Sequence, residues 1–382
     1  MLQYTRLGFP HIPASCPSIS ADRMSLCDIR NYLKDLIPES TIQTAILSIR
    51  ERWLNNPHKV EPLTEIRKIL DSIRSIPRSE WRLICMNTFV QVLGQPEIFA
   101  TFLDMIRDSS QRQGTQEQAL SEASRKSSKH AVYGWCGQTR LILSSTEHNS
   151  SVVTAEHGVQ ELLGKTPVSA WSLSMHIWQP NPNAKGFLCG HRTLQNIITE
   201  PPHSHPFDFA SVVVIGKIHQ SIYTQHRSEL LVDKKKIEFQ KGRYDGIILE
   251  HVHGVWPPHA YSEKSSVSTL EDRVELNAGD SYFMSCNTIH DVQIDASVAQ
   301  LQPAITLFLR SESFVKPHVY MSSSMADFHI SHPNLKNQGY PLLESDWNQK
   351  LELVANYIRG KTTALNLSNI VKYDNEYAFF HI

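Results

Sequence analysis

Three features that would assign a protein to a class at once are missing from this sequence. Its 382 residues contain no run of roughly 20 apolar residues, the length that spans a bilayer. Its charges nearly cancel, with 37 Lys and Arg against 38 Asp and Glu, so no overall field favours nucleic acid or a membrane surface. Its six cysteines form no C-x-x-C pair, which favours reduced thiols over a disulfide framework. These absences predict a soluble, cytoplasmic protein whose partners must be inferred from particular sites.

The spacing of apolar residues predicts a helical first part of the chain. Residues 1–24 are rich in Pro and Ser and predict a poorly ordered segment. Residues 25–107 repeat apolar side chains at intervals of three and four, which indicates an all-helical domain of about five helices. In residues 108–130 Ser, Gln and charged side chains dominate, and this composition predicts a polar linker.

Residues 131–323 predict β-structure instead. Short β-branched or aromatic runs, such as 209–215 and 281–284, are separated by Pro, Gly, Asn and Asp. Many short strands at this spacing indicate a sandwich or a barrel. Residues 324–382 return to a helical pattern at 347–359, and we expect this extension to pack on the barrel. The predicted fold class is therefore α+β.

Histidines carry the strongest chemical signal. His203 and His205 are two positions apart, and on a strand such a pair places both imidazoles on one face. His290 follows in a later stretch and completes a metal site if a neighbouring strand brings it alongside. The chain has 19 histidines, so a chance pair on a surface strand is the alternative interpretation. His251 and His253 form a second pair, but no partner at comparable spacing follows them.

The first histidine stretch resembles the first sequence motif of the cupin superfamily. That motif contains H-x-H followed by a glutamate and a glycine. His203, His205 and Gly216 keep its spacing, while Phe209 stands in place of the glutamate and Ile197 in place of an earlier glycine.

The second stretch resembles the second cupin motif. Gly279 and His290 keep its spacing, and Ser285, Asn287 and Ile294 replace its Pro, Gly and Asn. Asn is a sensible replacement for Gly because it tolerates the left-handed backbone conformation. The resemblance covers about residues 170–310. It implies that residues 131–323 form a cupin-like antiparallel β-barrel, or jelly roll, and that a homodimer can form.

The missing glutamate makes the resemblance more specific. His203, His205 and His290 would be three neutral ligands, as in the cupins that resemble thiol dioxygenases and hold non-heme ferrous iron. Fe(II) is therefore the expected metal, although imidazole also suits Ni, Cu and Zn, and Mn is a further alternative. Asp208 precedes the vacated position by one residue and could restore a carboxylate ligand after a small shift in register.

The resemblance implies a dioxygenase that oxidises a small polar substrate, such as cysteine or another thiol or amino acid, with dioxygen. Arg192 could clamp a substrate carboxylate, and Tyr223 and Tyr282 could donate to a bound substrate. A surface ion pair for Arg192 and hydrogen-bonded core positions for the tyrosines are the alternatives. Two other functions stay open: a metal-dependent isomerase, lyase or decarboxylase, and a non-catalytic cupin that binds a small ligand and has a helical partner-binding domain.

Overall fold

The structure of the chain is a computed structural model. It describes residues 41–78, 80–131, 138–145, 171–179, 197–199, 202–227, 244–250, 259–269, 274–286, 288–295, 298, 302–314, 318–321, 339–341, 343–363 and 365. Arg192, His251 and His253 lie outside these residues, as do the predicted segment 1–24 and the first part of the predicted helical domain.

Five α-helices form the first part of the described chain. They are α2 (Thr41–Asn55), α3 (Pro62–Ser75), α4 (Glu80–Leu93), α5 (Pro96–Ser110) and α6 (Gln116–Ser127), with a 3-10 turn η1 (Pro57–Lys59) after α2. Helices α3 and α5 begin with Pro, at a position where the missing backbone N–H costs no intrahelical hydrogen bond. The buried residues of α3, which include Leu63, Ile66, Leu70 and Ile73, repeat at intervals of three and four. The helical pattern over 41–107 is confirmed.

Helix α6 lies inside the segment 108–130, so the prediction of a polar linker was wrong there. The buried carboxylate of Glu117 accepts hydrogen bonds from the backbone N–H groups of Leu63 and Thr64, at 3.1 and 2.8 Å. Ser124 Oγ donates to the carbonyl oxygen of Leu143 in the neighbouring sheet, at 3.1 Å. Glu117 and Ser124 were misleading because these polar side chains bond to the backbone of neighbouring elements.

The described strands form two antiparallel sheets. Sheet A has the order β10 (Ser281–Met284), β5 (Phe207–Ile215), β12 (Ala304–Ser313), β3 (Ser172–Trp178), β2 (Gln138–Ser145), β1 (Lys129–Ala131) and β14 (Gly339–Pro341). Sheet B has the order β13 (His318–Met321), β7 (Tyr244–Glu250), β8 (His259–Thr269), β6 (Lys217–Arg227), β11 (Ile289–Asp295) and β4 (Ile197–Thr199), and β9 (Val274–Asn277) also pairs with β6. The predicted combination of helices and antiparallel strands is confirmed.

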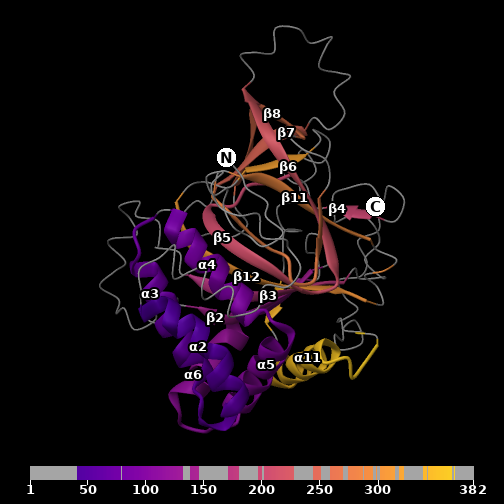
Figure 1. The fold of residues 1–382 in the computed structure, drawn as a ribbon. Helices are drawn as coiled ribbons and strands as arrows, with labels where there is room; N and C mark the ends of the chain where they lie inside the picture. The colour runs from indigo at the N-terminus through magenta and orange to yellow at the C-terminus, as the bar shows by residue number, and fades with distance from the viewer. Residues whose placement is uncertain are drawn as a thin grey trace, which may run out of the picture.

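The helices cover the outer face of sheet A, and sheet B lies on the other side of it (Figure 1). Side chains of β12 alternate between the two sides. Ile305, Leu307 and Leu309 belong to one hydrophobic core with the helices, whereas Ala304 and Phe308 belong to the core between the sheets. The helices and sheet A therefore share one core, and no polar linker separates them.

Helix α11 (Glu344–Ile358) confirms the helical pattern predicted near the end of the chain. It packs along α5, as Figure 1 shows, and its buried side chains join the core that the helices share with sheet A. An ion pair between Arg359 Nη2 and Asp104 Oδ2, at 2.5 Å, fixes its end against α5. We expected this extension to pack on the barrel. Its apolar face instead packs against the helices, chiefly α5.

The two sheets face each other, and no pairing among the described strands closes them into a barrel. The predicted barrel is thus observed as two opposed sheets. The chain passes from β5 in sheet A to β6 in sheet B through Gly216, whose φ is +77°. A Cβ atom there would lie 2.8 Å from Ala304 Cα, so this turn requires glycine.

None of the helices in the described part of the chain has the combination of length and apolar character needed to cross a membrane.

Candidate metal centre

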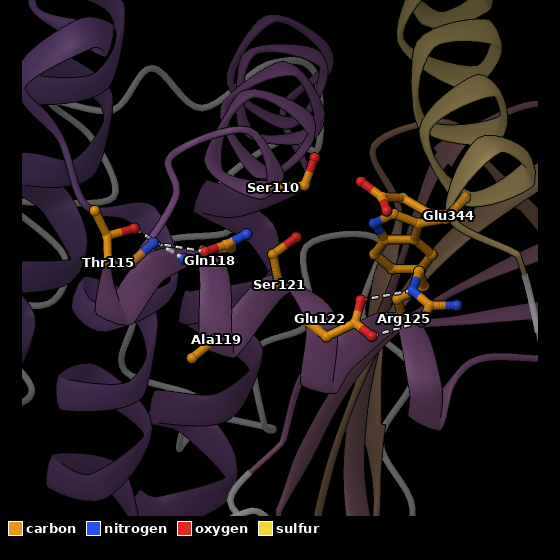
Figure 2. A pocket seen from close by; sticks show the side chains of 10 residues that line it. Ser110, Thr115, Gln118, Ala119, Ser121, Glu122, Arg125 and Glu344 are labelled. Carbon is orange, nitrogen blue, oxygen red and sulfur yellow. Dashed lines mark hydrogen bonds and ion pairs between the residues drawn. The ribbon is translucent and has the colours of Figure 1, made fainter.

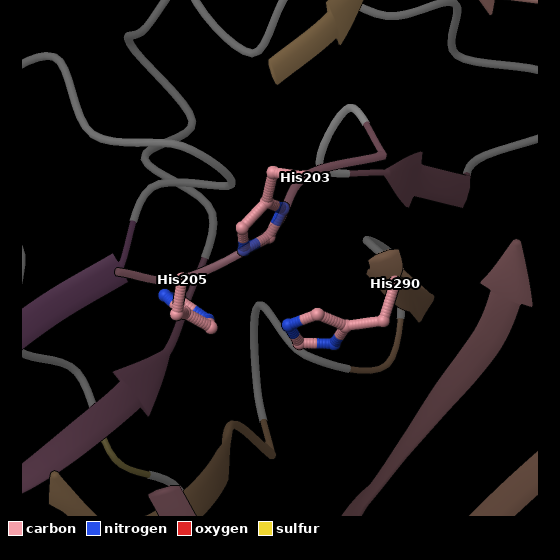
Figure 3. A group of neighbouring side chains, drawn as sticks. All are labelled: His203, His205 and His290. Atoms are coloured by element: carbon pink, nitrogen blue, oxygen red, sulfur yellow. The ribbon is translucent and has the colours of Figure 1, made fainter. Parts of the chain in front are cut away.

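A pair of backbone hydrogen bonds brings the two histidine stretches together. His203 N donates to His290 O at 2.8 Å, and His290 N donates to His203 O at 2.9 Å, so the two residues form an isolated antiparallel bridge. His205 follows on the same face as His203. A nitrogen atom from each of the three rings lies within 4.8 Å of the other two. Figure 3 shows the three rings turned toward a common point.

The three histidines form a largely buried group. His203 is buried and His290 is 2% exposed. Burial, and to a lesser extent the neighbouring His203, hold the pKa of His290 well below its ordinary value. A neutral imidazole keeps one nitrogen lone pair, which is what a transition metal binds. The group found among the described residues contains no carboxylate. The structure thus brings the predicted ligands together, and their role as ligands stays a prediction.

Aromatic rings surround this group on the side of sheet A. The ring centre of Phe209 lies 4.9 Å from that of His205 and 5.5 Å from that of His290. Phe207 stacks on His205 at 5.0 Å, and Phe308 stacks on Phe209 at 4.8 Å. Phe209 stands where the sequence motif that this stretch resembles has a glutamate, so an apolar ring packs on two histidines at that place.

Asp208 does not join the histidines, although we considered it as a fourth ligand. Its carboxylate accepts hydrogen bonds from Arg78 Nε at 2.9 Å, from Arg78 Nη2 at 3.2 Å and from the backbone N–H of Cys286 at 3.0 Å. The physical reason is strand alternation: Phe207 and Phe209 face the histidines, so the residue between them faces the other way. The same carboxylate raises the pKa of the Arg78 guanidinium.

Tyr223 also lies on a face directed away from the histidines. On β6 it is paired with Ile289, whereas Ile222 is paired with His290. Its hydroxyl donates to Asp291 Oδ2 at 2.8 Å, and burial raises the pKa of that carboxyl. The catalytic role that we predicted for Tyr223 therefore has no support from its position. A sequence does not show which face of a strand points toward the site, so the role stays a prediction that this orientation does not favour.

Tyr282 lies in the core between the sheets, on the histidine side. Its ring centre is 6.0 Å from that of Phe209, whose ring in turn packs on His205 and His290. Its predicted role stays a prediction. The predicted role of Arg192 also stays a prediction, because Arg192 lies outside the described residues.

Gln220 is a site residue that our reading of the sequence missed. Its Nε2 atom lies 2.7 Å from His290 Nδ1, and the side chain is completely buried. The signal was present in the spacing, because the apolar residues Ile218 and Ile222 flank Gln220 at intervals of two. Alternation then places all three side chains on the inner face of sheet B.

A cavity of about 490 Å³ lies elsewhere, between α5, α6 and α11 (Figure 2). Its wall carries Arg125, whose Nε and Nη2 atoms donate to the two carboxylate oxygens of Glu122 at 2.7 and 2.5 Å. Because these charges compensate each other, the cavity does not indicate a class of ligand.

No family model matches the chain, and no curated protein matches its sequence. Among solved structures, the search finds L-ribose isomerase from Cellulomonas parahominis at 12% identity and a TM-score of 0.26, covering 61% of this chain and 94% of that one. It also finds an oxalate oxidase in complex with the substrate analogue glycolate, at 13% identity and a TM-score of 0.14, covering 50% of this chain and 65% of that one. These scores are too low to carry an argument about fold or activity.

Proposed function

We propose that this chain is a metal-dependent enzyme that holds Fe(II) through His203, His205 and His290 and oxidises a small substrate with dioxygen. The observation that carries the proposal is the convergence of three imidazoles, with no carboxylate among the described residues of the group. Three neutral ligands leave the full charge of a divalent metal to attract an anionic donor atom, such as a thiolate or a carboxylate.

The residues fit such a metal. His290 Nε2 is buried and has no hydrogen-bond partner, and an unpaired buried nitrogen among imidazoles is the arrangement that a cation would complete. When bound, Fe(II) would supply open coordination positions and the redox chemistry that dioxygen requires. The chain itself would hold the histidine rings with Phe207, Phe209 and Phe308 and keep water away from that side.

Arg310 is the described residue that best suits an anionic substrate. It follows the outward-facing Leu309 on β12, and its guanidinium carbon lies 5.3 Å from the ring centre of Phe207, which itself stacks on His205. Arg310 Nε donates to Ser172 Oγ at 2.7 Å, which holds the guanidinium in place. We infer a substrate that combines an anionic donor for the metal with a small apolar part for the aromatic wall.

Oxygen uptake tests the reaction. The Fe(II)-loaded chain should consume dioxygen in the presence of small thiols or amino acids, and the Zn(II)-loaded chain should not. Both atoms of dioxygen enter the substrate in such a reaction, so no added reductant is needed. His205→Ala should abolish uptake. His219→Ala is the control and should leave uptake unchanged, because His219, on β6, lies beside Glu275 of β9 and not in the histidine group.

Two outcomes would overturn the oxygenase assignment. Turnover without oxygen consumption would identify a Lewis-acid isomerase, lyase or decarboxylase. Tight binding of small ligands without turnover would identify a non-catalytic binding protein.

A further inference from the structure

Gln220 and His290 form the contact from which a new inference follows. Both residues are buried, and they lie on the inner face of sheet B on adjacent strands. The distance of 2.7 Å between Gln220 Nε2 and His290 Nδ1 is short enough for one hydrogen bond. Among the described residues, the Gln220 amide makes one further contact, from Nε2 to Met284 Sδ at 4.0 Å, where sulfur is a weak acceptor.

In this orientation the contact works against a metal. An amide nitrogen can only donate, so His290 Nδ1 must accept, and the proton of the neutral ring then lies on Nε2. Nε2 is the buried atom without a partner, and a protonated Nε2 has no lone pair to give to a metal. Gln220 Oε1 is also buried without a partner. One hydrogen bond is thus made at the expense of two buried polar atoms that have none.

Half a turn of the amide changes the hydrogen-bonding pattern. Oε1 takes the place of Nε2 and accepts a hydrogen bond from His290 Nδ1–H. Nε2 of the ring then carries its lone pair toward His203 and His205. The amide nitrogen moves to the former place of Oε1 and gives up its contact with Met284 Sδ, so a metal that engages the ring would stabilise this orientation.

We propose that Gln220 is a positioning residue for the metal: in the metal-bound protein its Oε1 accepts the Nδ1 proton of His290 and so selects the tautomer that binds metal through Nε2. This inference rests on the proposed metal site and does not depend on the reaction. Hydrogen bonds from a ligating histidine to an outer acceptor orient the ring and strengthen it as a ligand.

Metal affinity in Gln220 variants tests the proposal, with Zn(II) or Co(II) as the probe in a chelator competition. Gln220→Leu removes the acceptor and should weaken binding roughly 10- to 100-fold. Gln220→Glu supplies a group that accepts from Nδ1–H, and it should bind at least as tightly as the natural chain. The matched control is Gln293→Leu, because Gln293 bonds to Asp291 on the other face of sheet B, and its affinity should be unchanged.

Two further measurements separate positioning from a merely structural role. Urea unfolding of the metal-free Gln220→Leu protein should show no loss of stability, because leucine removes an amide whose Oε1 atom is buried without a partner. Nitrogen-15 NMR of the Zn(II)-loaded natural chain should show the His290 proton on Nδ1.

Natural affinity in Gln220→Leu, or a His290 ring without a proton on Nδ1 when zinc is bound, would overturn the proposal for Gln220 and leave the metal site standing. A natural chain that binds neither probe would overturn both. None of these measurements uses oxygen uptake. A failure of the oxygenase assignment would therefore show in the uptake assay and leave these results unchanged.

Discussion

Strand β12 separates two cores of different chemistry. Its outward side chains Leu307 and Leu309 pack with the helical layer in a core rich in aliphatic and phenyl groups. Its inward residue Phe308 joins the smaller core between the sheets, where aromatic rings press against histidines. Consecutive residues of one strand thus serve two purposes, because alternation sends one to the helices and the next toward the candidate metal centre.

The difference teaches where stability and chemistry are located. The helix-side core is the larger of the two and contains the most voluminous fully buried residues, among them Trp53, Trp171 and Trp347. On its sheet B side lie His290 and Gln220, which contact each other at 2.7 Å and each carry one buried polar atom without a hydrogen-bond partner. We therefore expect changes on the helix side to alter the free energy of unfolding, and changes on the inner side to alter metal binding.

The largest effect is expected from Leu307→Ala, which opens a cavity in the helix-side core. Truncation of a fully buried leucine costs about 2–5 kcal/mol of unfolding free energy, measured by urea denaturation of the metal-free protein. Zn(II) affinity of the folded variant should stay unchanged. Val298→Ala is the control, because Val298 is 44% exposed and should change the unfolding free energy by less than about 0.5 kcal/mol. A loss of zinc affinity in Leu307→Ala would show that the two faces are coupled.

A second prediction concerns Lys350, a buried charge in the apolar helix-side core. Burial lowers its pKa from 10.5 to about 8, and its Nζ has no hydrogen-bond partner. Below pH 8 the lysine is charged in the folded and the unfolded chain, and the folded chain bears the full desolvation cost. Between pH 8 and 10.5 only the unfolded chain keeps the proton, so stability should rise with pH in this window.

Lys350→Met removes that cost. At pH 7 the free energy of unfolding should rise by on the order of 3 kcal/mol, because one pKa unit corresponds to about 1.4 kcal/mol. The gain should shrink as the pH is raised above 8. Thermal or urea unfolding at several pH values measures it, and a gain that does not depend on pH would contradict the assignment.

A smaller effect is expected from Arg78→Met. It tests whether Asp208 faces Arg78 and not the histidines, unlike its neighbour Phe209. The substitution leaves the buried Asp208 carboxylate without its guanidinium partner. Because Arg78 is half-exposed, we expect a cost of about 1–2 kcal/mol and not the larger loss typical of fully buried pairs. Metal affinity should be unchanged in this variant and in Asp208→Asn. Loss of bound metal in either would place Asp208 in the metal centre after all.

Much of the fold could be predicted because apolar spacing reports local structure directly. Helices α3 and α4 and most of α5 lie inside the predicted helical domain, and strands β5 and β10 begin and end close to the predicted runs 209–215 and 281–284. Helix α6 could not be found in this way, since Glu117 and its serines bond to neighbouring backbone that a sequence does not reveal. A polar segment looks the same whether its partners are water or protein.

The candidate site could be predicted only in part, for a related reason. The spacing of His203 and His205 fixes their common face, and the second motif brought in His290. The orientation of Asp208 and Tyr223 depends on how strands pair across the sheets, which no local pattern gives. Gln220 could not be identified for the same reason, because its place beside His290 follows from the register in which β6 pairs with β11.

The central claim is that three histidines form one transition-metal site, and metal stoichiometry tests it most directly. After loading with Fe(II) or Zn(II) and removal of excess metal, the natural chain should hold one ion per chain. His290→Ala should hold none while keeping the unfolding behaviour of a folded protein. One ion per chain in His290→Ala, or no bound ion in the natural chain, would contradict the account.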